Sequence, residues 1–178
     1  MLKFSGKKMF ATMNVVTMGL MAALYVALYA IKIPIAVESR VSVTFIPVAV
    51  AAYLMGPVAG ILVGGIGDLL SCLLFPSGPY YPGFTVSAMM VGMIYGFFFL
   101  GRKGSMMRLR VIGATAIITV GVNMLLNTLW LADLYEKAYF VFLISRSIKN
   151  LIVFPFQIII TIILLESLDR TGITKKFI

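Results

Sequence analysis

Long apolar runs, each closed by a turn or a group of charged residues, follow one another along nearly the whole chain. A helix that crosses the roughly 30 Å hydrocarbon core of a bilayer needs about 20 apolar residues. The runs that approach this length are residues 11–31, 41–55, 58–75, 84–100, 111–131 and 138–168. The pattern therefore predicts one all-α membrane domain over residues 1–178, with six transmembrane helices of unequal length and tilt.

Proline and glycine residues separate the apolar runs. Pro34 ends the first run together with two charged residues, and Gly56-Pro57 forms a tight turn that a helix does not continue through. Residues 75–83 form a charge-free loop with three prolines and two glycines. The chain shows neither a polar linker nor an internal repeat, so we expect no second, water-soluble domain.

The overall composition supports a membrane protein. Of 178 residues, 61% are hydrophobic and 12% are charged, and the mean hydropathy is +1.06. A water-soluble domain needs far more polar surface than these fractions supply. The net charge of +9 raises nucleic-acid binding as an alternative, but the basic residues stand between apolar runs rather than along a solvent-facing surface. We therefore expect lipid, and no nucleic acid, as the surroundings.

The basic residues also predict the orientation in the membrane. Loops on the cytoplasmic side carry an excess of lysine and arginine. If the N-terminus lies in the cytoplasm, three basic residues fall outside: Lys32, Arg40 and Lys137. The others named here fall inside: Lys3, Lys7, Lys8, Arg102, Lys103, Arg108, Arg110, Arg170, Lys175 and Lys176. We expect both termini in the cytoplasm and the first run to be a retained helix, because no signal-peptide cleavage site follows it.

Motifs for catalysis or cofactor binding are missing from the sequence. There is no G-x-x-x-x-G-K-[ST] phosphate loop, no histidine and no nucleophile motif with a matching base. Cys72 is the one cysteine, which excludes a disulfide within the chain and a His/Cys metal cluster. Gly64-Gly-Ile-Gly67 predicts close helix packing rather than phosphate binding. We expect no enzyme activity, no cofactor and no metal.

The sixth run carries a polar stripe at membrane depth. At 100° per residue, Arg146, Asn150 and Gln157 lie within about 40° of one another, and Lys149 lies about 60° to the other side. Buried cations are costly in a membrane, so this stripe must face the protein interior or a wet cavity. Asp68 lies at a similar depth, about 10–12 Å below the outer end. An internal ion pair is the structural alternative, but two cations exceed one carboxylate and favour an anionic ligand.

The fifth run carries a second polar face. Spacings of four and seven place Asn123, Asn127 and Trp130 on one side of a helix. Amides donate and accept hydrogen bonds and an indole offers a stacking surface, so the three residues suit a planar heterocycle. Hydrogen bonding between helices is the alternative for each asparagine taken alone.

Two further features have a functional and a structural interpretation. Tyr80, Tyr81 and Phe84 project from the rigid loop at the outer side, where they form either a pocket wall and lid or an interfacial aromatic belt. Small residues at every fourth position of the first run, Gly19, Ala23 and Ala27, allow a second helix to approach closely. The sequence alone does not decide whether that helix belongs to this chain or to a partner.

These features in this order resemble the substrate-binding (S) components of energy-coupling factor (ECF) vitamin transporters, and among them the folate-specific family. The resemblance covers nearly the whole chain. The segments that carry it are Arg40, Thr44-Phe-Ile-Pro47, Met55-Gly-Pro-Val-Ala-Gly60, Gly67-Asp68, Pro76-Ser-Gly-Pro-Tyr-Tyr-Pro-Gly-Phe-Thr85, Ile94-Tyr-Gly96, Asn127-Thr-Leu-Trp130 and Arg146-x-x-Lys149. The A-x-x-x-A contact motif of the family's first helix matches Ala23 and Ala27.

The resemblance implies the ECF S-component fold, with six helices and an outward-facing vitamin pocket, in the plasma membrane of a prokaryote. Such a protein associates with a transmembrane scaffold subunit and two ATPase subunits from other chains, and topples in the membrane to carry its ligand inward. For a folate-like ligand, Asp68 or an asparagine would bind the pterin donors. Aromatic residues would stack on the ring, and the anionic tail would bind among Arg40, Arg146 and Lys149.

Three other functions remain open at this point. An S component for riboflavin, thiamin or biotin keeps the family and changes the vitamin, although buried cations disfavour cationic thiamin and, more mildly, neutral riboflavin. A standalone transporter or small channel would usually show an inverted repeat or a broken helix. A membrane assembly protein would use its small-residue faces for packing alone.

Overall fold

The computed structural model describes residues 12–31, 33–36, 39–41, 43–76, 79–99, 106–135 and 139–172; side chains at 33–41, 140–142 and 145 lie outside this description. Helices dominate the described part. Their bounds are α2 (Thr12–Ala30), α3 (Phe45–Met55), α4 (Pro57–Leu74), α5 (Pro82–Phe99), α6 (Met107–Ile117), the π-helix η1 (Ile118–Leu126), α7 (Asn127–Tyr135) and α8 (Tyr139–Arg170). Two short strands, β1 (Ile33–Ala36) and β2 (Ser39–Val41), join α2 to α3.

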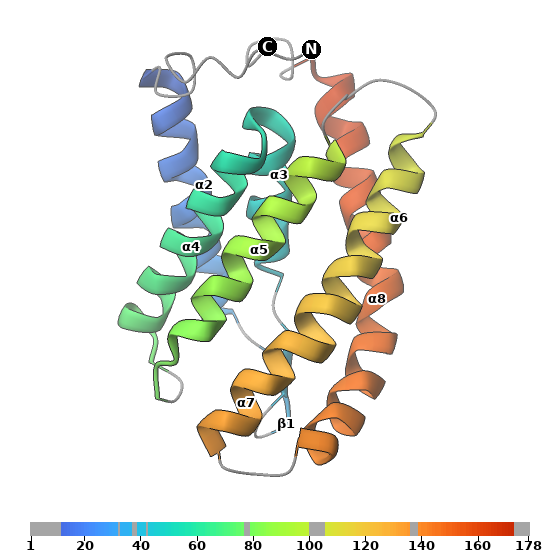
Figure 1. The fold of residues 1–178 in the computed structure, drawn as a ribbon. Coiled ribbons are helices and arrows are strands. Elements are labelled where there is room, and N and C mark those ends of the chain that lie inside the picture. Colours follow the sequence, from blue (N-terminus) through green and yellow to red (C-terminus); the bar gives the residue numbers. More distant parts are fainter. Residues whose placement is uncertain are drawn as a thin grey trace.

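The helical segments confirm the all-α membrane fold predicted from the apolar runs. Within the described residues, five segments are long and apolar enough to cross a membrane: α2, α4, α5, the continuous run from α6 to α7, and α8. The start of α2 and the end of α8 lie at the same end of the molecule (Figure 1). This arrangement agrees with an even number of crossings, and we call this end the inner end and the opposite one the outer end.

The second helix, α3, is shorter than the predicted run of residues 41–55. Its 11 residues extend about 16 Å, which is less than the hydrocarbon core. Eight consecutive residues, Pro47 to Leu54, are buried, so α3 lies inside the bundle rather than against lipid. Gly56 ends it with φ +90°, a conformation that favours glycine, and Pro57 begins α4 at once.

A small β-hairpin lies in the break between the first two predicted spans and reaches the first residue of the second, Val41. β1 and β2 pair antiparallel, with Ile33 opposite Val41 and Pro34 opposite Arg40. The hairpin was not predicted, because three or four residues in extended conformation leave too short a pattern to recognise. Figure 1 places β1 at the same end of the molecule as α7, which is the outer end.

Helices α4 and α5 approach each other through glycines. A Cβ atom on Gly64 would lie 2.5 Å from the carbonyl oxygen of Ala88, and one on Gly92 would overlap the backbone of Gly60. This confirms that the glycine-rich segment of α4 serves close helix packing.

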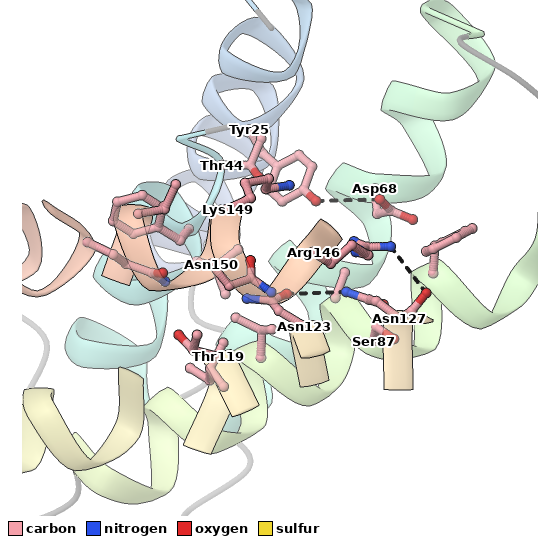
Figure 2. Close-up of a pocket in the computed structure, with 18 residues that line it drawn as sticks. Tyr25, Thr44, Asp68, Ser87, Thr119, Asn123, Asn127, Arg146, Lys149 and Asn150 are labelled. Carbon is pink, nitrogen blue, oxygen red and sulfur yellow. Dashed lines mark hydrogen bonds between the residues drawn. The ribbon is translucent and has the colours of Figure 1, made fainter. Parts of the chain in front are cut away.

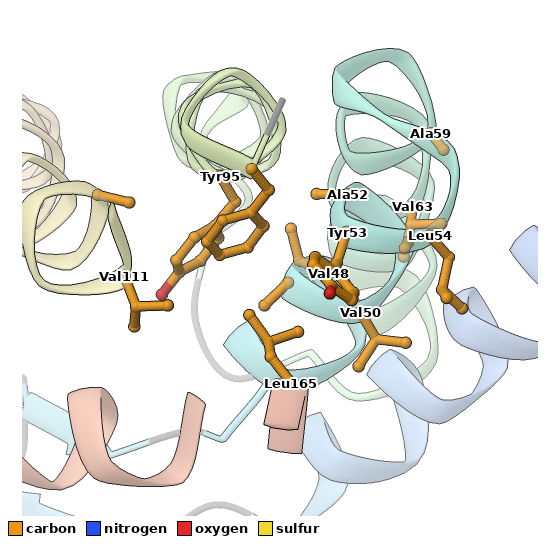
Figure 3. Packing of buried hydrophobic residues seen from close by; sticks show 14 of the residues in the cluster. Val48, Val50, Ala52, Tyr53, Leu54, Ala59, Val63, Tyr95, Val111 and Leu165 are labelled. Carbon is orange, nitrogen blue, oxygen red and sulfur yellow. The ribbon is translucent and has the colours of Figure 1, made fainter. Parts of the chain in front are cut away.

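The hydrophobic core occupies the inner half of the bundle. Figure 3 shows Tyr53, Val63, Tyr95, Val111 and Leu165 converging from α3, α4, α5, α6 and α8. Tyr53 and Tyr95 are fully buried. These side chains hold the inner parts of the five helices together.

Candidate binding cavity

A cavity of about 250 Å³ lies among α2, α3, α4, α5, η1, α7 and α8. Six of the residues predicted to bind a ligand line it: Asp68, Phe84, Asn123, Asn127, Arg146 and Lys149. Asn150 and Gln157 of the predicted polar stripe line it too, together with four further polar residues, Tyr25, Thr44, Ser87 and Thr119, and with apolar side chains. Figure 2 shows most of these polar side chains gathered around one space.

The cations come from α8, where the predicted polar stripe faces the cavity. Arg146 and Lys149 are one helical turn apart, and Asn150 and Gln157 continue the stripe toward the inner end. The Arg146 side chain extends toward Asn127 (Figure 2), and its Nη1 donates a hydrogen bond of 3.3 Å to the Asn127 carbonyl oxygen. The Nε atom of Arg146 is buried and has no hydrogen-bond partner among the described residues. A ligand acceptor at this point would compensate a donor that is costly to leave unpaired.

The carboxylate comes from α4 and is held by two hydroxyl groups. Thr85 on α5 donates a hydrogen bond of 2.8 Å to Oδ2 of Asp68. Tyr25 on α2 donates one of 3.5 Å to Oδ1, which Figure 2 shows. Asp68 is buried, with 8% of its surface exposed. Asp68 therefore joins three helices and also places a negative charge in the cavity wall.

The amide wall is built on the π-helical segment. Nδ2 of Asn127 donates to Oδ1 of Asn123 at 3.2 Å, which fixes both amides. In a π-helix, hydrogen bonds join residues i and i+5, so side chains four or five residues apart share a face. Thr119, Asn123 and Asn127 consequently all line the cavity. Sequence spacing alone could have added Thr119, four residues before Asn123.

Several polar atoms at this wall are buried without hydrogen-bond partners in the described part of the chain. They are Oγ1 of Thr119, Oδ1 of Asn127 and Nδ2 of Asn150, in addition to Nε of Arg146. Buried polar groups in proteins nearly always have partners, and exceptions at a cavity indicate a missing ligand or water. These atoms offer both donors and acceptors, as a polar heterocycle requires.

The remaining predicted aromatic residues form a layer beside the cavity rather than part of its lining. Nε1 of Trp130 donates a hydrogen bond of 3.1 Å to Oγ of the cavity residue Ser87. The ring centroids of Trp130 and Tyr81 lie 5.7 Å apart. The hydroxyl of Tyr80 lies 3.0 Å from Oγ1 of Thr85. Trp130 and Tyr80 thus each contact a residue that lines the cavity or binds Asp68.

An exposed hydrogen bond joins this aromatic layer to the end of α7. The hydroxyl of Tyr81 donates to Oδ2 of Asp133 at 2.7 Å and joins the loop before α5 to the end of α7. This hydrogen bond raises the pKa of the Tyr81 phenol above its ordinary value. Gly83 lets the indole of Trp130 lie against the backbone, because a Cβ there would come within 2.5 Å of it.

The predicted binding residue Arg40 and the predicted docking residues of α2 are not part of the described cavity lining. Arg40 lies in β2, and its side chain is outside the described part of the structure. Gly19, Ala23 and Ala27 on α2 are exposed, and a Cβ on Gly19 would meet no atom within 4 Å. The small-residue strip therefore faces away from the described part of this chain.

A second cavity, of about 370 Å³, lies at the inner end between α6 and α8. Its charged residues already have partners: Arg108 Nε lies 2.8 Å from Glu166 Oε1, and Asp169 accepts a hydrogen bond from Tyr53. Exposed pairs of this kind contribute little and need no ligand. The cavity with unpartnered buried donors and acceptors is the better candidate for a binding site.

Comparison with known proteins agrees with this geometry. Residues 13–165 match the family model described as ECF transporter, substrate-specific component. The chain is 41% identical over 137 residues to the folate transporter FolT of Clostridium novyi (strain NT), covering 77% of this chain and 78% of that protein. It is 32% identical over 143 residues to the FolT of Leuconostoc mesenteroides subsp. mesenteroides, covering 77% and 76%.

Solved structures show the same fold. The crystal structure of FolT bound with folic acid matches with a TM-score of 0.80 and 34% identity, over 89% of this chain and 97% of that one. The structure of the S component of a bacterial ECF transporter matches with a TM-score of 0.67 and 24% identity, over 89% and 94%.

Proposed function

The chain belongs to the family of ECF transporter substrate-specific components, which are multi-pass plasma-membrane proteins, and we propose that its cavity binds folate for import. The family is one of transporters rather than enzymes. The observation that carries the proposal is the combination, in one cavity, of two cations with buried amide atoms that have no hydrogen-bond partner in the described part of the chain.

The charge distribution in the cavity supports a specific orientation of the ligand. Folate has a flat, neutral pterin ring at one end and a glutamate with two carboxylates at the other. Arg146 and Lys149 match the carboxylates, because a guanidinium and an ammonium group bind anions strongly. Gln157 lies eleven residues further along α8, about 16 Å toward the inner end. We place the ring at this inner, uncharged part and the glutamate tail near the cations.

The outer residues support this placement. Phe84 lines the cavity, and Tyr80, Tyr81 and Trp130 form the layer beside it. In the proposal these aromatic residues cover the ligand on its outer side, and Arg40 supplies a third cation from the hairpin. Asp68, Asn123 and Asn127 provide further polar contacts along the length of the ligand.

Import requires an energy source that this chain does not carry, since it has no nucleotide-binding motif. In the proposal, a transmembrane scaffold and two ATPase subunits from other chains supply it. The exposed strip of Gly19, Ala23 and Ala27 on α2 docks with the scaffold. ATP hydrolysis then topples the subunit so that the outward-facing cavity releases folate inside.

Titration of the purified protein with folic acid tests the binding site. Arg146→Ala and Lys149→Ala each remove a charged hydrogen-bond donor, so the Kd should rise by about tenfold or more. Trp130 fluorescence is a suitable readout, because its indole is bonded to the cavity residue Ser87. Arg108→Ala, which removes an exposed cation at the inner end, is the matched control and should bind as the wild type does.

The same titration separates the proposal from its rivals. Tighter binding of riboflavin, thiamin or biotin than of folic acid would identify another vitamin as the ligand. Unchanged folic acid affinity in both cation variants would remove Arg146 and Lys149 from the site. Folate uptake driven by a proton or sodium gradient through this chain alone would rule out the dependence on ATPase subunits.

A further inference from the structure

A serine in the cavity wall accepts a hydrogen bond from a tryptophan and keeps its own hydroxyl hydrogen for another acceptor. We propose that Ser87 is a further binding residue, which donates a hydrogen bond to an anionic group of the ligand, and that Trp130 is the positioning residue that orients it. The proposal rests on the binding of a folate-like ligand by this cavity. It gives Trp130 a task that does not require contact with the ligand.

The bond between Trp130 and Ser87 has only one possible direction. Nε1 of Trp130 lies 3.1 Å from Oγ of Ser87. An indole nitrogen donates hydrogen bonds and does not accept them, so the serine oxygen is the acceptor. The single hydrogen of the Ser87 hydroxyl is therefore not used in this contact.

The hydroxyl of Ser87 also differs from those of other serines in the helices. Ser71, Ser147 and Ser167 each donate to the backbone carbonyl oxygen four residues earlier, at 2.6 to 2.8 Å. Within the described part of the chain, Ser87 makes no such bond to Gly83, and its one hydrogen bond is that with the indole. Ser87 is 3% exposed and lines the cavity. Because a buried donor without an acceptor is costly, we expect the ligand to supply the acceptor.

The turn of α7 that carries the indole also holds Arg146. Nη1 of Arg146 donates to the carbonyl oxygen of Asn127, which lies three residues before Trp130 and about 4.5 Å from it along the helix. Ser87 and Arg146 therefore lie on the same side of the cavity, as Figure 2 shows. Nε of Arg146 is a second buried donor without a partner among the described residues. Two neighbouring donors of this kind fit a carboxylate, which has acceptors only.

The negative charge of Asp68 is bound to a different face of α5. Its carboxylate accepts a hydrogen bond from Thr85, two residues before Ser87. Two residues correspond to 200° of rotation, so the two side chains lie about 160° apart around the helix. Thr85 thus faces α4 and Ser87 faces α7. The carboxylate in the cavity wall leaves the hydroxyl of Ser87 to the ligand.

Binding of two ligands that differ in the charge of the tail tests the assignment of Ser87. Folic acid carries two carboxylates on its glutamate, and the diamide of folic acid carries two neutral amide groups there. A hydrogen bond to a charged acceptor is the stronger one. Ser87→Ala should therefore raise the Kd of folic acid about tenfold or more, and that of the diamide about threefold or less. Isothermal titration calorimetry is the measurement, because Trp130 is the single tryptophan of the chain and is itself replaced below.

A double-mutant cycle tests the positioning role of Trp130. Trp130→Phe keeps an aromatic ring and removes the indole N–H, so the Kd of the diamide divided by that of folic acid should fall about threefold. In a chain that already carries Ser87→Ala, the same substitution should leave this ratio unchanged, because no hydroxyl is left to orient. Poorer packing of the smaller ring would weaken the binding of both ligands alike and would not alter the ratio.

Ser71→Ala on α4 is the matched control for the serine. It removes a fully buried hydroxyl that bonds to the carbonyl oxygen of Gly67 and does not line the cavity. Both ligands should bind to this variant with the wild-type Kd.

The outcomes distinguish this inference from the proposed function. Failure of the wild type to bind folic acid would overturn the proposed function. Binding of folic acid with the same Kd in Ser87→Ala as in the wild type would overturn only the assignment of Ser87, and so would an equal loss of affinity for folic acid and the diamide. A ratio that falls by the same factor on Trp130→Phe with and without the Ser87 hydroxyl would overturn the positioning role of Trp130.

Discussion

At the scale of single residues, the cavity contains charges of both signs, and the negatively charged residue, Asp68, also holds helices together. Asp68 accepts hydrogen bonds from Tyr25 and Thr85, so one carboxylate joins α2, α4 and α5. Arg146 makes its hydrogen bond to the Asn127 carbonyl oxygen on another wall. The Asp68 carboxylate is therefore bound to neighbouring helices of the bundle. Arg146 retains a buried donor, its Nε atom, for a ligand.

Substitution of Asp68 should consequently affect stability as well as binding. Asp68→Ala leaves the hydroxyls of Tyr25 and Thr85 without their acceptor, and should lower the free energy of unfolding by about 1–3 kcal/mol. The measurement is thermal unfolding in detergent without ligand. Thr85→Val removes only one of the two donors and should have the smaller effect. An unfolding temperature for Asp68→Ala equal to that of the wild type would show that the carboxylate does not hold the three helices together.

The residues that could be predicted from the sequence are those that are costly inside a membrane. A charge such as Asp68, Arg146 or Lys149 in an apolar run has few explanations, and the structure places all three at the cavity. Tyr25 and Thr119 also line it but carry no such cost, because tyrosine and threonine are common in apolar helices. The place of Tyr25 followed only from the arrangement of the helices, whereas the spacing from Asn123 could have indicated Thr119.

At the scale of elements, helix positions could be predicted and local irregularities could not. The bounds of the apolar runs and of the helices agree to within about four residues at each end. The π-helix η1 lies within a run that predicts an ordinary helix, because its apolar residues carry no local mark of i+5 bonding. This irregularity matters for the site, since it places Asn123 between Thr119 and Asn127 on one wall.

Close packing of α4 against α5 should be sensitive to a single methyl group. In Gly92→Ala, the new Cβ would overlap the backbone of Gly60, and backbone atoms cannot move aside as a flexible side chain can. The free energy of unfolding should fall by about 1–3 kcal/mol, as for other overpacked sites.

Gly19→Ala on α2 is the matched control, because its Cβ would meet no atom within 4 Å. It should unfold at the wild-type temperature or slightly above it, since alanine favours helix more than glycine does. Equal unfolding temperatures for Gly92→Ala and the wild type would mean that α4 and α5 can move apart enough to accept the methyl group with no loss of stability.

At the scale of the whole molecule, the inner half of the bundle holds the aromatic part of the hydrophobic core, and the outer half holds the candidate binding cavity. Tyr53, Tyr95 and Phe99 fill the inner half, and the bond from Gln157 to Tyr95 joins the two halves. A cavity closed at its inner end cannot act as a channel. Release of a ligand inside the cell then requires a movement of the protein, and the proposed toppling would provide one.

Such a movement needs a contact surface that is separate from the binding site, and the strip on α2 has this property. Ala23→Phe or Ala27→Phe adds a large side chain to an exposed position, so folic acid binding in detergent should be unchanged. Close approach of the scaffold should be blocked, and the co-purified scaffold and ATPase subunits, as well as ATP-dependent folate uptake, should fall by about tenfold or more. Leu109→Phe on α6, also exposed, is the control and should retain both the co-purified subunits and folate uptake.

Full assembly and uptake in both Ala23→Phe and Ala27→Phe would place the docking surface elsewhere. Loss of folic acid binding would mean that α2 shapes the cavity through this face as well as through Tyr25.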